Sequence, residues 1–284
     1  MHKRFLCTLA AFLLAALALA PAARGAQAAP PPALSACYLV MDADTGQVLI
    51  EQNADERRSP ASVTKVMTMG LAMEKAQGVL DTQLTVTYDD VHQLEAGSSH
   101  IALIEGEQVR LEDILYGTEI ASANDGANVL AEYIGGSIQA GVDAMNQKAG
   151  ELGLEGTHFT NPHGLYDENH YSTPYDMAVI LKEAADNEFC RKVLSEHRYV
   201  TTSTAEHPGG IDISNLFLRR IEDRDTHGEV LCAKTGYVDQ SKNCAASLAS
   251  DHDGREYICV TAGSDSAWIC IRDQVALYQR YLPE

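Results

Sequence analysis

The placement of the strand-like segments most constrains the fold, because they lie at both ends of the chain and leave a helical middle. Cys37–Met41 and Val48–Glu51 are short apolar runs separated by Asp-Ala-Asp-Thr-Gly, a pattern typical of a β-hairpin. Three further strand-like runs occupy 229–238, 243–251 and 256–264. If the two groups pair, they form one five-stranded antiparallel sheet, and the helical middle must be inserted into it.

The middle of the chain shows the spacing of amphipathic helices. Pro60 suits the first turn of a helix that continues through Gly78 with Ala, Met and Leu at helical intervals. Further helical patterns cover the segments 110–122, 124–136, 141–154, 172–187 and 268–281. The sequence therefore predicts an α+β domain over 35–284, with a five-stranded antiparallel sheet flanked by helices and an inserted all-helical region.

The first 28 residues have the order of a secretory signal peptide. A basic start is followed by the apolar run Phe5–Ala20 and by an Ala-x-Ala exit at Ala26–Ala28. The alternative is a membrane-spanning anchor, but the run is short for a span and Pro21 favours cleavage. We expect a signal peptide over 1–28 and a Pro/Ala-rich linker over 29–34.

Charge and cysteine content point to an exported, extracytoplasmic protein. The net charge of −19 argues against nucleic acid as a partner and against adsorption to an anionic membrane. Of seven cysteines, six remain after processing, which permits disulfides without revealing their pairing. Because neither the cysteines nor the ten histidines show a metal-binding spacing, we expect no metal and no cofactor. The chain ends at "VALYQRYLPE", so we also expect no membrane anchor.

The stretch "RRSPASVTKVMTMG" places Lys65 three residues after Ser62, among small and apolar residues. Positions i and i+3 share one face of a helix, and the first turn offers free backbone N–H groups for an oxyanion. A lysine held away from water loses its charge more easily and can act as a base toward a hydroxyl. Taken alone, the pattern also fits a capping serine beside a surface lysine.

Two further short motifs carry hydroxyl, amide and amine groups. Ser122-Ala123-Asn124 lies where two helical segments meet, and Lys234-Thr235-Gly236 lies inside the strand "EVLCAKTGYV". The first motif alone fits a helix junction with caps, and the second an edge-strand lysine. In the second, Gly236 allows a backbone to pass close to a ligand or to the helix that carries Ser62.

The order S-x-x-K, S-x-N, K-T-G is the signature set of serine acyl-transferring, penicillin-recognising enzymes. The similarity extends from about Cys37 to the closing helix, and the chain resembles the D-alanyl-D-alanine carboxypeptidase family, the low-molecular-mass penicillin-binding proteins. The segments that carry it are "DADTGQVLIEQNADERRSPASVTKVMT", "GEQVRLEDILYGTEIASANDGANVLAE", "MNQKAGELGLEGTHFTNPHGLYDENHYSTPYDMA" and "KTGYVDQSKNC". The resemblance implies a β-lactamase/transpeptidase-like fold. It also implies removal of the terminal D-alanine from peptidoglycan stem peptides, with penicillins acylating the same serine.

The resemblance also assigns catalytic roles to four residues. Ser62 is the acylated nucleophile and Lys65 is its base. Ser122 relays a proton, and Asn124 orients the substrate and the lysine. Amide cleavage is thereby split into attack by the serine and hydrolysis of the acyl-enzyme by water.

A second group of residues would bind the substrate. By the same resemblance, Lys234 and Thr235 hold its C-terminal carboxylate, next to Gly236. The backbone N–H groups of Ser62 and Tyr237 form the oxyanion hole.

Two further positions match the family less specifically. His163 in "NPHGL" and Asp176 in "YDMA" match positions that line or support the site. An isolated histidine or a helical aspartate is more often structural.

Three alternatives remain open on the same scaffold. A class A β-lactamase shares all three motifs, but its deacylating glutamate lies in an E-x-x-L-N motif that is absent from 126–233. A catalytically dead wall-binding relative is disfavoured by the intact motifs. An esterase or a D-amino-acid amidase is also possible, since fold does not fix substrate. Many relatives carry a further β-rich domain and a C-terminal membrane anchor, and we expect neither here.

Overall fold

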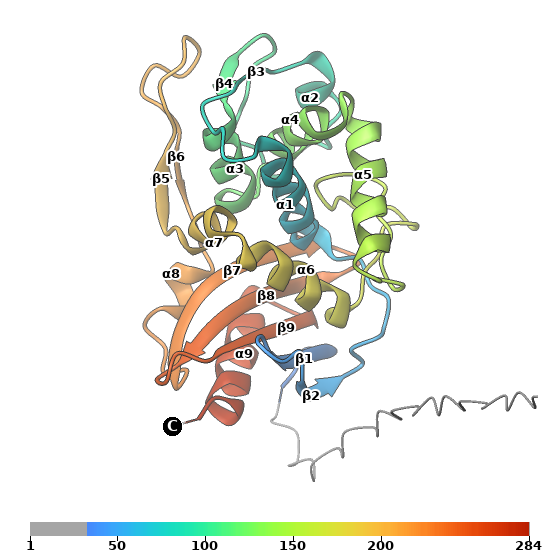
Figure 1. Cartoon of the computed structure of the whole chain (residues 1–284), viewed down its shortest axis with the longest axis vertical. Helices are drawn as coiled ribbons and strands as arrows, with labels where there is room; N and C mark the ends of the chain where they lie inside the picture. Colours follow the sequence, from blue (N-terminus) through green and yellow to red (C-terminus); the bar gives the residue numbers. More distant parts are fainter. Residues whose placement is uncertain (1–32, 284) are drawn as a thin grey trace, which may run out of the picture.

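The five strands predicted from the two ends of the chain form one antiparallel sheet, as expected. In the computed structural model, which describes residues 33–283, the sheet order is β2-β1-β9-β8-β7 (Figure 1). Its strands are β1 (Cys37–Asp42), β2 (Val48–Gln52), β7 (Gly228–Val238), β8 (Lys242–Asp251) and β9 (Glu256–Ser264). The N-terminal hairpin pairs with the last strand, through β1 and β9. This leaves β7 as an edge strand.

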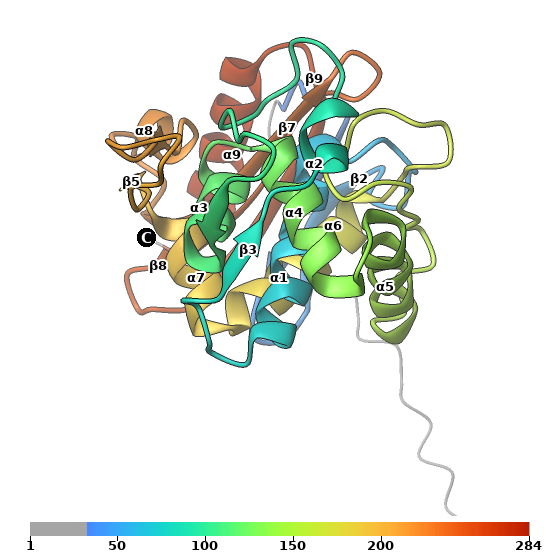
Figure 2. The same ribbon diagram turned by 90° about the horizontal axis from the view of Figure 1, so that it is seen from above.

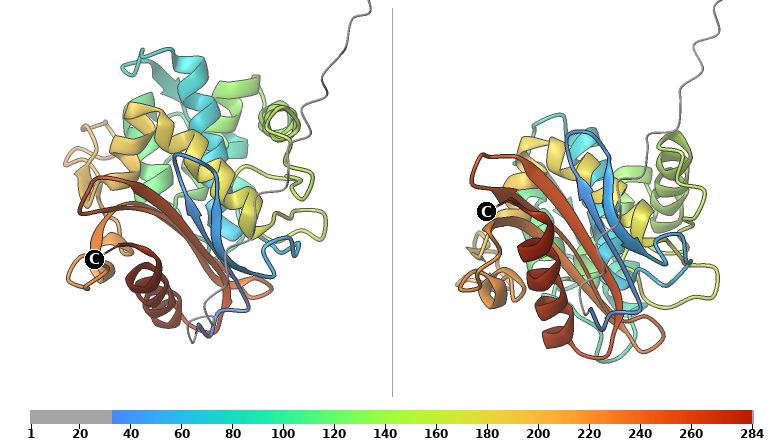
Figure 3. Two further views of the ribbon diagram at one scale, coloured as in Figure 1. Left: turned by 60° about the horizontal axis from the view of Figure 1, so that its bottom comes forward. Right: turned by 90° about the horizontal axis from the view of Figure 1, so that it is seen from below.

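Helices cover both faces of the sheet, which explains why its central strands are apolar on both sides. The closing helix α9 (Ala267–Tyr281) packs on one face, and α6 (Pro174–Asp186) packs on the other (Figure 3). Almost every residue of β9 is buried between them. The α9 face also contains a satisfied polar network, in which Ser247 Oγ donates to Gln274 Oε1 at 2.6 Å.

The inserted helical region is built around one buried helix, α1 (Thr64–Ala76), which a short 3-10 turn at Ala61–Val63 precedes. Four other helices of this region contact α1 and lie around it in Figure 2; they are α3 (Leu111–Ile120), α4 (Asn124–Gly135), α5 (Ile138–Glu151) and α7 (Glu188–Ser195). Helix α2 (Tyr88–His92) packs on α4, and α8 (Leu218–Ile221) packs on β7 and α9. Two small hairpins complete the fold: β3 (Gln83–Thr85) with β4 (Gln108–Arg110), and β5 (Arg198–Val200) with β6 (Asp212–Ser214).

The boundaries of several predicted helices shift for identifiable reasons. The helix predicted from Pro60 starts as a 3-10 turn, and its regular part begins at Thr64. Helix α5 begins at Ile138, earlier than the pattern predicts, because the Ser137 side chain accepts the N–H of Ala140 and caps the helix. The two small hairpins and the helices α2, α7 and α8 were not predicted, since their apolar runs are too short to show a period.

The predicted signal peptide and most of the predicted linker lie outside the described residues. Within 33–283, no helix is long and apolar enough to cross a membrane. The six cysteines of this range are all buried and none forms a disulfide; they are Cys37, Cys190, Cys232, Cys244, Cys259 and Cys270.

Candidate active site

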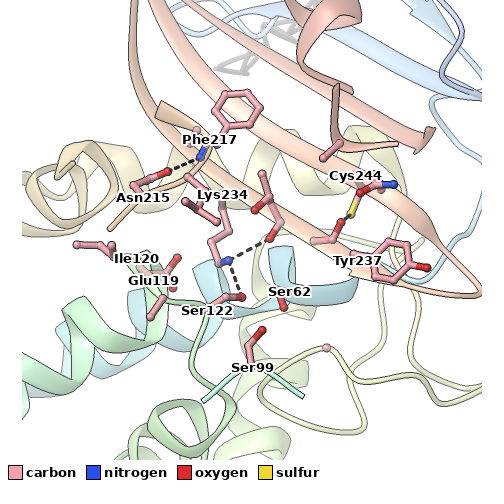
Figure 4. A pocket seen from close by; sticks show the side chains of 18 of the residues that line it. Ser62, Ser99, Glu119, Ile120, Ser122, Asn215, Phe217, Lys234, Tyr237 and Cys244 are labelled. Atoms are coloured by element: carbon pink, nitrogen blue, oxygen red, sulfur yellow. Dashed lines mark hydrogen bonds between the residues drawn. The ribbon is translucent and has the colours of Figure 1, made fainter. Parts of the chain in front are cut away.

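A cavity of about 390 Å³ opens where the helical region meets the free edge of β7 (Figure 4). It brings together the three sequence motifs, which are far apart in the chain. The predicted residues that line it are Ser62, Ser122, Asn124, Lys234, Thr235, Gly236 and Tyr237. Lys65 does not line the cavity but contacts Ser62 from within the protein.

Ser62 lies in the 3-10 turn that leads into α1, beside a strained residue. Ala61 has a φ of 46°, a left-handed conformation that is uncommon for a residue with a side chain. Gly164 fits against this turn, because a Cβ there would lie 1.8 Å from the carbonyl oxygen of Ala61. The loop that contains Gly164 therefore packs directly against the segment that positions the serine.

The K-T-G strand packs against the same turn from the other side. A Cβ on Gly236 would lie 2.8 Å from the backbone nitrogen of Ser62 and 2.9 Å from the Cβ of Ala61. Only glycine permits this approach. The close passage that the sequence predicts for Gly236 is therefore observed.

Lys65 is completely buried, and its amine makes two short polar contacts. The Nζ atom donates to Ser62 Oγ at 3.0 Å and to the backbone oxygen of His163 at 2.7 Å. Burial lowers the pKa of Lys65 well below its usual value, and the charge of Lys234 lowers it further. A neutral amine within hydrogen-bonding distance of a hydroxyl is the arrangement that a general base requires.

The Ser122-Ala123-Asn124 motif forms the junction between α3 and α4, as predicted. Ser122 has a φ of 59°, and the N–H of Asn124 donates to the carbonyl oxygen of Ser99 at 2.9 Å. This strained turn points the Ser122 hydroxyl toward β7, where it accepts a hydrogen bond of 2.9 Å from Lys234 Nζ (Figure 4).

Lys234 is 3% exposed although it lies on an edge strand. Besides Ser122, its Nζ donates to the backbone oxygen of Thr235 at 3.0 Å. Burial lowers the pKa of Lys234, while the nearby Glu119 carboxylate raises it. The neighbouring Thr235 and Tyr237 side chains are exposed, so β7 presents a hydroxyl and an aromatic ring at the rim of the cavity.

The two weaker candidates lie behind the cavity. His163 contributes its backbone oxygen to Lys65, and burial lowers the pKa of its ring well below the usual value. Asp176 does not line the cavity; its Oδ2 accepts a 2.7 Å hydrogen bond from Thr157 Oγ1, and Thr173 caps the helix that carries it. Any support that Asp176 gives to the site is therefore indirect.

The sequence patterns did not predict that His170 helps to hold the start of α1, where Thr64 precedes Lys65. It is buried, and its Nδ1 accepts the N–H of Thr160 at 3.1 Å, so the proton lies on Nε2, 2.8 Å from Thr64 Oγ1. Burial lowers the pKa of His170 to about 4, which keeps this link neutral. Only its side-chain contacts reveal the role, since the surrounding sequence looks like an irregular loop.

Several residues that were not predicted also line the cavity. Among them are Glu119 at the end of α3, Ser99 in the loop before β4, Asn215 after β6, and Arg220 in α8. Ser99 and Asn215 are ordinary loop residues in sequence. Glu119 had a visible signal, an acidic residue within the apolar face of a predicted helix.

The arrangement is suited to acyl transfer by a serine. A hydroxyl lies beside a buried amine on one side, and a second hydroxyl and amine face it across the cavity. Lys65 can take a proton from the nucleophile, and the Ser122 hydroxyl can relay a proton to a leaving group.

Comparisons with known proteins agree with this geometry. A family model described as D-alanyl-D-alanine carboxypeptidase (Peptidase_S11) matches residues 24–266. The D-alanyl-D-alanine carboxypeptidase DacF of Bacillus subtilis is 35% identical over 80% of this chain and 57% of its own length. The chain thus spans little more than half of that relative. A Streptomyces K15 D-alanyl-D-alanine carboxypeptidase is 30% identical over 80% of this chain and 79% of its own length.

Solved structures show the same fold. Penicillin binding protein 5 of Haemophilus influenzae matches with a TM-score of 0.78 and 29% identity, over 89% of this chain and 72% of that chain. The Streptomyces K15 DD-transpeptidase matches with a TM-score of 0.80 and 26% identity, over 90% of this chain and all of that chain.

Proposed function

Because the chain belongs to the D-alanyl-D-alanine carboxypeptidase family, we propose that it removes the terminal D-alanine of peptidoglycan stem peptides through an acyl-enzyme on Ser62. The observation that carries the proposal is the contact between Lys65 and Ser62. A completely buried amine lies 3.0 Å from the hydroxyl. Burial lowers the pKa of this amine and so favours its uncharged form, which can accept the proton of the hydroxyl.

Acylation would proceed from this contact. Ser62 Oγ attacks the carbonyl carbon of the D-alanyl-D-alanine amide, and its proton passes to Lys65 Nζ. The developing oxyanion would be bound by the backbone N–H groups of Ser62 and Tyr237. The close packing of Gly236 against the Ser62 backbone nitrogen supports this assignment. The C–N bond breaks, and the leaving amine takes the proton held by Lys65, relayed through the Ser122 hydroxyl, which restores the uncharged Lys65. Lys234 keeps its own proton and holds the Ser122 hydroxyl at 2.9 Å.

Substrate binding would use the edge of the sheet. β7 pairs on one side only, so an extended peptide can lie along its free edge. The substrate's terminal carboxylate would bind the Lys234 ammonium and the exposed hydroxyl of Thr235, and Asn124 would hold a backbone amide. Water then hydrolyses the Ser62 ester and regenerates the enzyme.

The same site would react with β-lactam antibiotics, which are cyclic amides that carry a carboxylate. We also infer that the protein works outside the cytoplasm, where peptidoglycan stem peptides are found. The supports for this location are the family and the leader-like sequence.

Fluorescent penicillin tests the proposal directly. The parent protein should be labelled covalently, and peptide mapping by mass spectrometry should place the label on Ser62. Ser62→Ala should not be labelled. Equal labelling of Ser62→Ala and the parent would exclude Ser62 as the nucleophile.

A further inference from the structure

Glu119 is a buried acid that the catalytic scheme above does not use. It lies in the last turn of α3, is 4% exposed and lines the cavity together with Ser122 and Lys234 (Figure 4). Neither of its carboxylate oxygens has a hydrogen-bond partner among residues 33–283. Such a group is costly to bury and calls for an explanation.

The charges of two lysines lower the pKa of the Glu119 carboxyl, against the larger effect of burial, which raises it. Lys234 on β7 lowers the pKa more than Lys65 on α1 does. On the α7 side lies the thiol of Cys190, whose pKa is raised to about 12 by burial first and by the Glu119 charge second, so this thiol carries no charge at neutral pH. Glu119 thus lies among two basic groups and one neutral group.

The other acid near the lysines is already engaged. Asp125 on α4 acts on Lys65, but its carboxylate accepts the backbone N–H groups of Ile101, Leu103 and Gly126. Its negative charge is therefore largely satisfied by the backbone. Glu119 remains as the carboxylate whose charge is directed at both lysines.

We propose that Glu119 is a positioning residue of the active site, whose carboxylate is the counter-charge that keeps Lys234 protonated beside a neutral Lys65. The inference rests on the proposed function, in which Lys234 must be a cation and Lys65 a base. The two lysines need opposite protonation states although both are buried. One carboxylate can balance the charge of one ammonium group, and the electrostatic interaction of Glu119 with Lys234 is stronger than its interaction with Lys65.

The protonation of Glu119 gives this device a pH dependence. Burial raises the pKa of Glu119 to about 7, so its carboxylate forms as the pH rises through neutrality. Alkaline pH is also where a buried Lys234 would begin to lose its proton. Glu119 therefore supplies the counter-charge in the range where Lys234 needs it, and has little effect at lower pH.

Acylation by a fluorescent penicillin, measured as a second-order rate constant from pH 5.5 to 9.5, tests the inference. In Glu119→Gln, the alkaline limb should move to lower pH by about one unit, which is about tenfold in rate beyond that limb. At pH 6 the variant and the parent should differ little. Glu119→Asp should lie between them. Glu112→Gln, the same change on the same helix away from the cavity, should match the parent.

A purely structural role would scale the whole profile without moving its limbs, and that result would overturn the inference. A readout that does not depend on catalysis is ¹³C NMR of lysine-labelled protein, with the Lys234 signal assigned by Lys234→Arg. We expect a lower titration midpoint for Lys234 in Glu119→Gln. An unchanged midpoint overturns the inference. If the parent is not acylated at any pH, the proposed function fails, and this midpoint still decides the role of Glu119.

Discussion

The Nζ atom of Lys65 lies 3.0 Å from Ser62 Oγ while the lysine side chain is completely shielded from solvent. The contact spans one turn at the start of α1, and the carbonyl oxygen of His163 holds the amine from the opposite side. Burial favours the uncharged amine, so the position that shields the side chain also prepares it as a base.

Replacing Lys65 should strongly reduce acylation and leave the fold intact. Lys65→Arg cannot lose its proton, and Lys65→Met has no base, so each should reduce penicillin acylation by about 10²–10⁴-fold, the usual contribution of a general base. Lys182→Met, a change at a lysine on α6 that is far more exposed, should acylate like the parent. Acylation at the parental rate in Lys65→Met would refute the role of the lysine.

Lys65→Met should also stabilise the folded protein. The pKa of Lys65 is lowered in the folded state, so the unfolded chain binds the additional proton and stability falls as the pH drops below the ordinary lysine range. Lys65→Met lacks this penalty. Its melting temperature should exceed that of the parent at pH 7, and the difference should be larger at pH 7 than at pH 10. A lower melting temperature at both pH values would contradict the burial argument.

The close packing at Gly236 predicts a sharp steric effect. The Cβ of Gly236→Ala would press on the Ser62 backbone and on Cys244 Sγ, which would lie 2.9 Å away. We expect a destabilisation of about 1–3 kcal/mol, the typical cost of overpacking, and a loss of acylation of at least about tenfold because the oxyanion donors move apart. Gly150→Ala in α5 meets no atom within 4 Å and serves as the control. Denaturant unfolding and penicillin labelling measure the two effects.

The Glu119 carboxylate should lower the stability of the fold in the same pH range in which it acts as the counter-charge of Lys234. Its folded-state pKa is raised from 4.5 to about 7, so the folded protein holds the additional proton and loses stability as the pH rises between these values. At 1.36 kcal/mol per pKa unit, the loss is on the order of 3 kcal/mol at most. Glu119→Gln should therefore melt at a higher temperature than the parent at pH 8, with a smaller difference at pH 4.5. A constant difference across this range would show that the carboxyl is not perturbed by burial.

The acyl-enzyme formed with penicillin should be long-lived. No E-x-x-L-N segment is present in 126–233, and no carboxylate forms a hydrogen bond with Ser62 among the described contacts. We expect labelled protein to persist after excess penicillin is removed, and the catalytic hydrolysis of a chromogenic β-lactam to be slow. Rapid multiple turnover would instead indicate a β-lactamase.

The sheet and the principal site residues could be predicted because both depend on patterns of neighbouring residues that are visible in the sequence alone. Strand runs at the two ends of the chain predicted that the two groups join in one sheet, and the structure joins them through β1 and β9. Three motifs placed Ser62, Ser122 and Lys234 together, since each sits where its element meets the cavity.

Other parts of the site depend on contacts between residues distant in sequence. His170 reaches Thr64 across 106 positions. The burial of Glu119 arises only when α3, α7 and β7 come together. Asp176 was expected to line or support the site, but its carboxylate holds a neighbouring turn. A helical aspartate gives no sign in sequence of which neighbour it will contact.

Mass spectrometry of a stem pentapeptide ending in D-alanyl-D-alanine, incubated with the protein, tests the proposed activity most directly. We predict conversion to the tetrapeptide with release of one D-alanine by the parent and no conversion by Ser62→Ala. An unchanged pentapeptide with the parent, under conditions in which penicillin labels Ser62, would contradict the carboxypeptidase assignment.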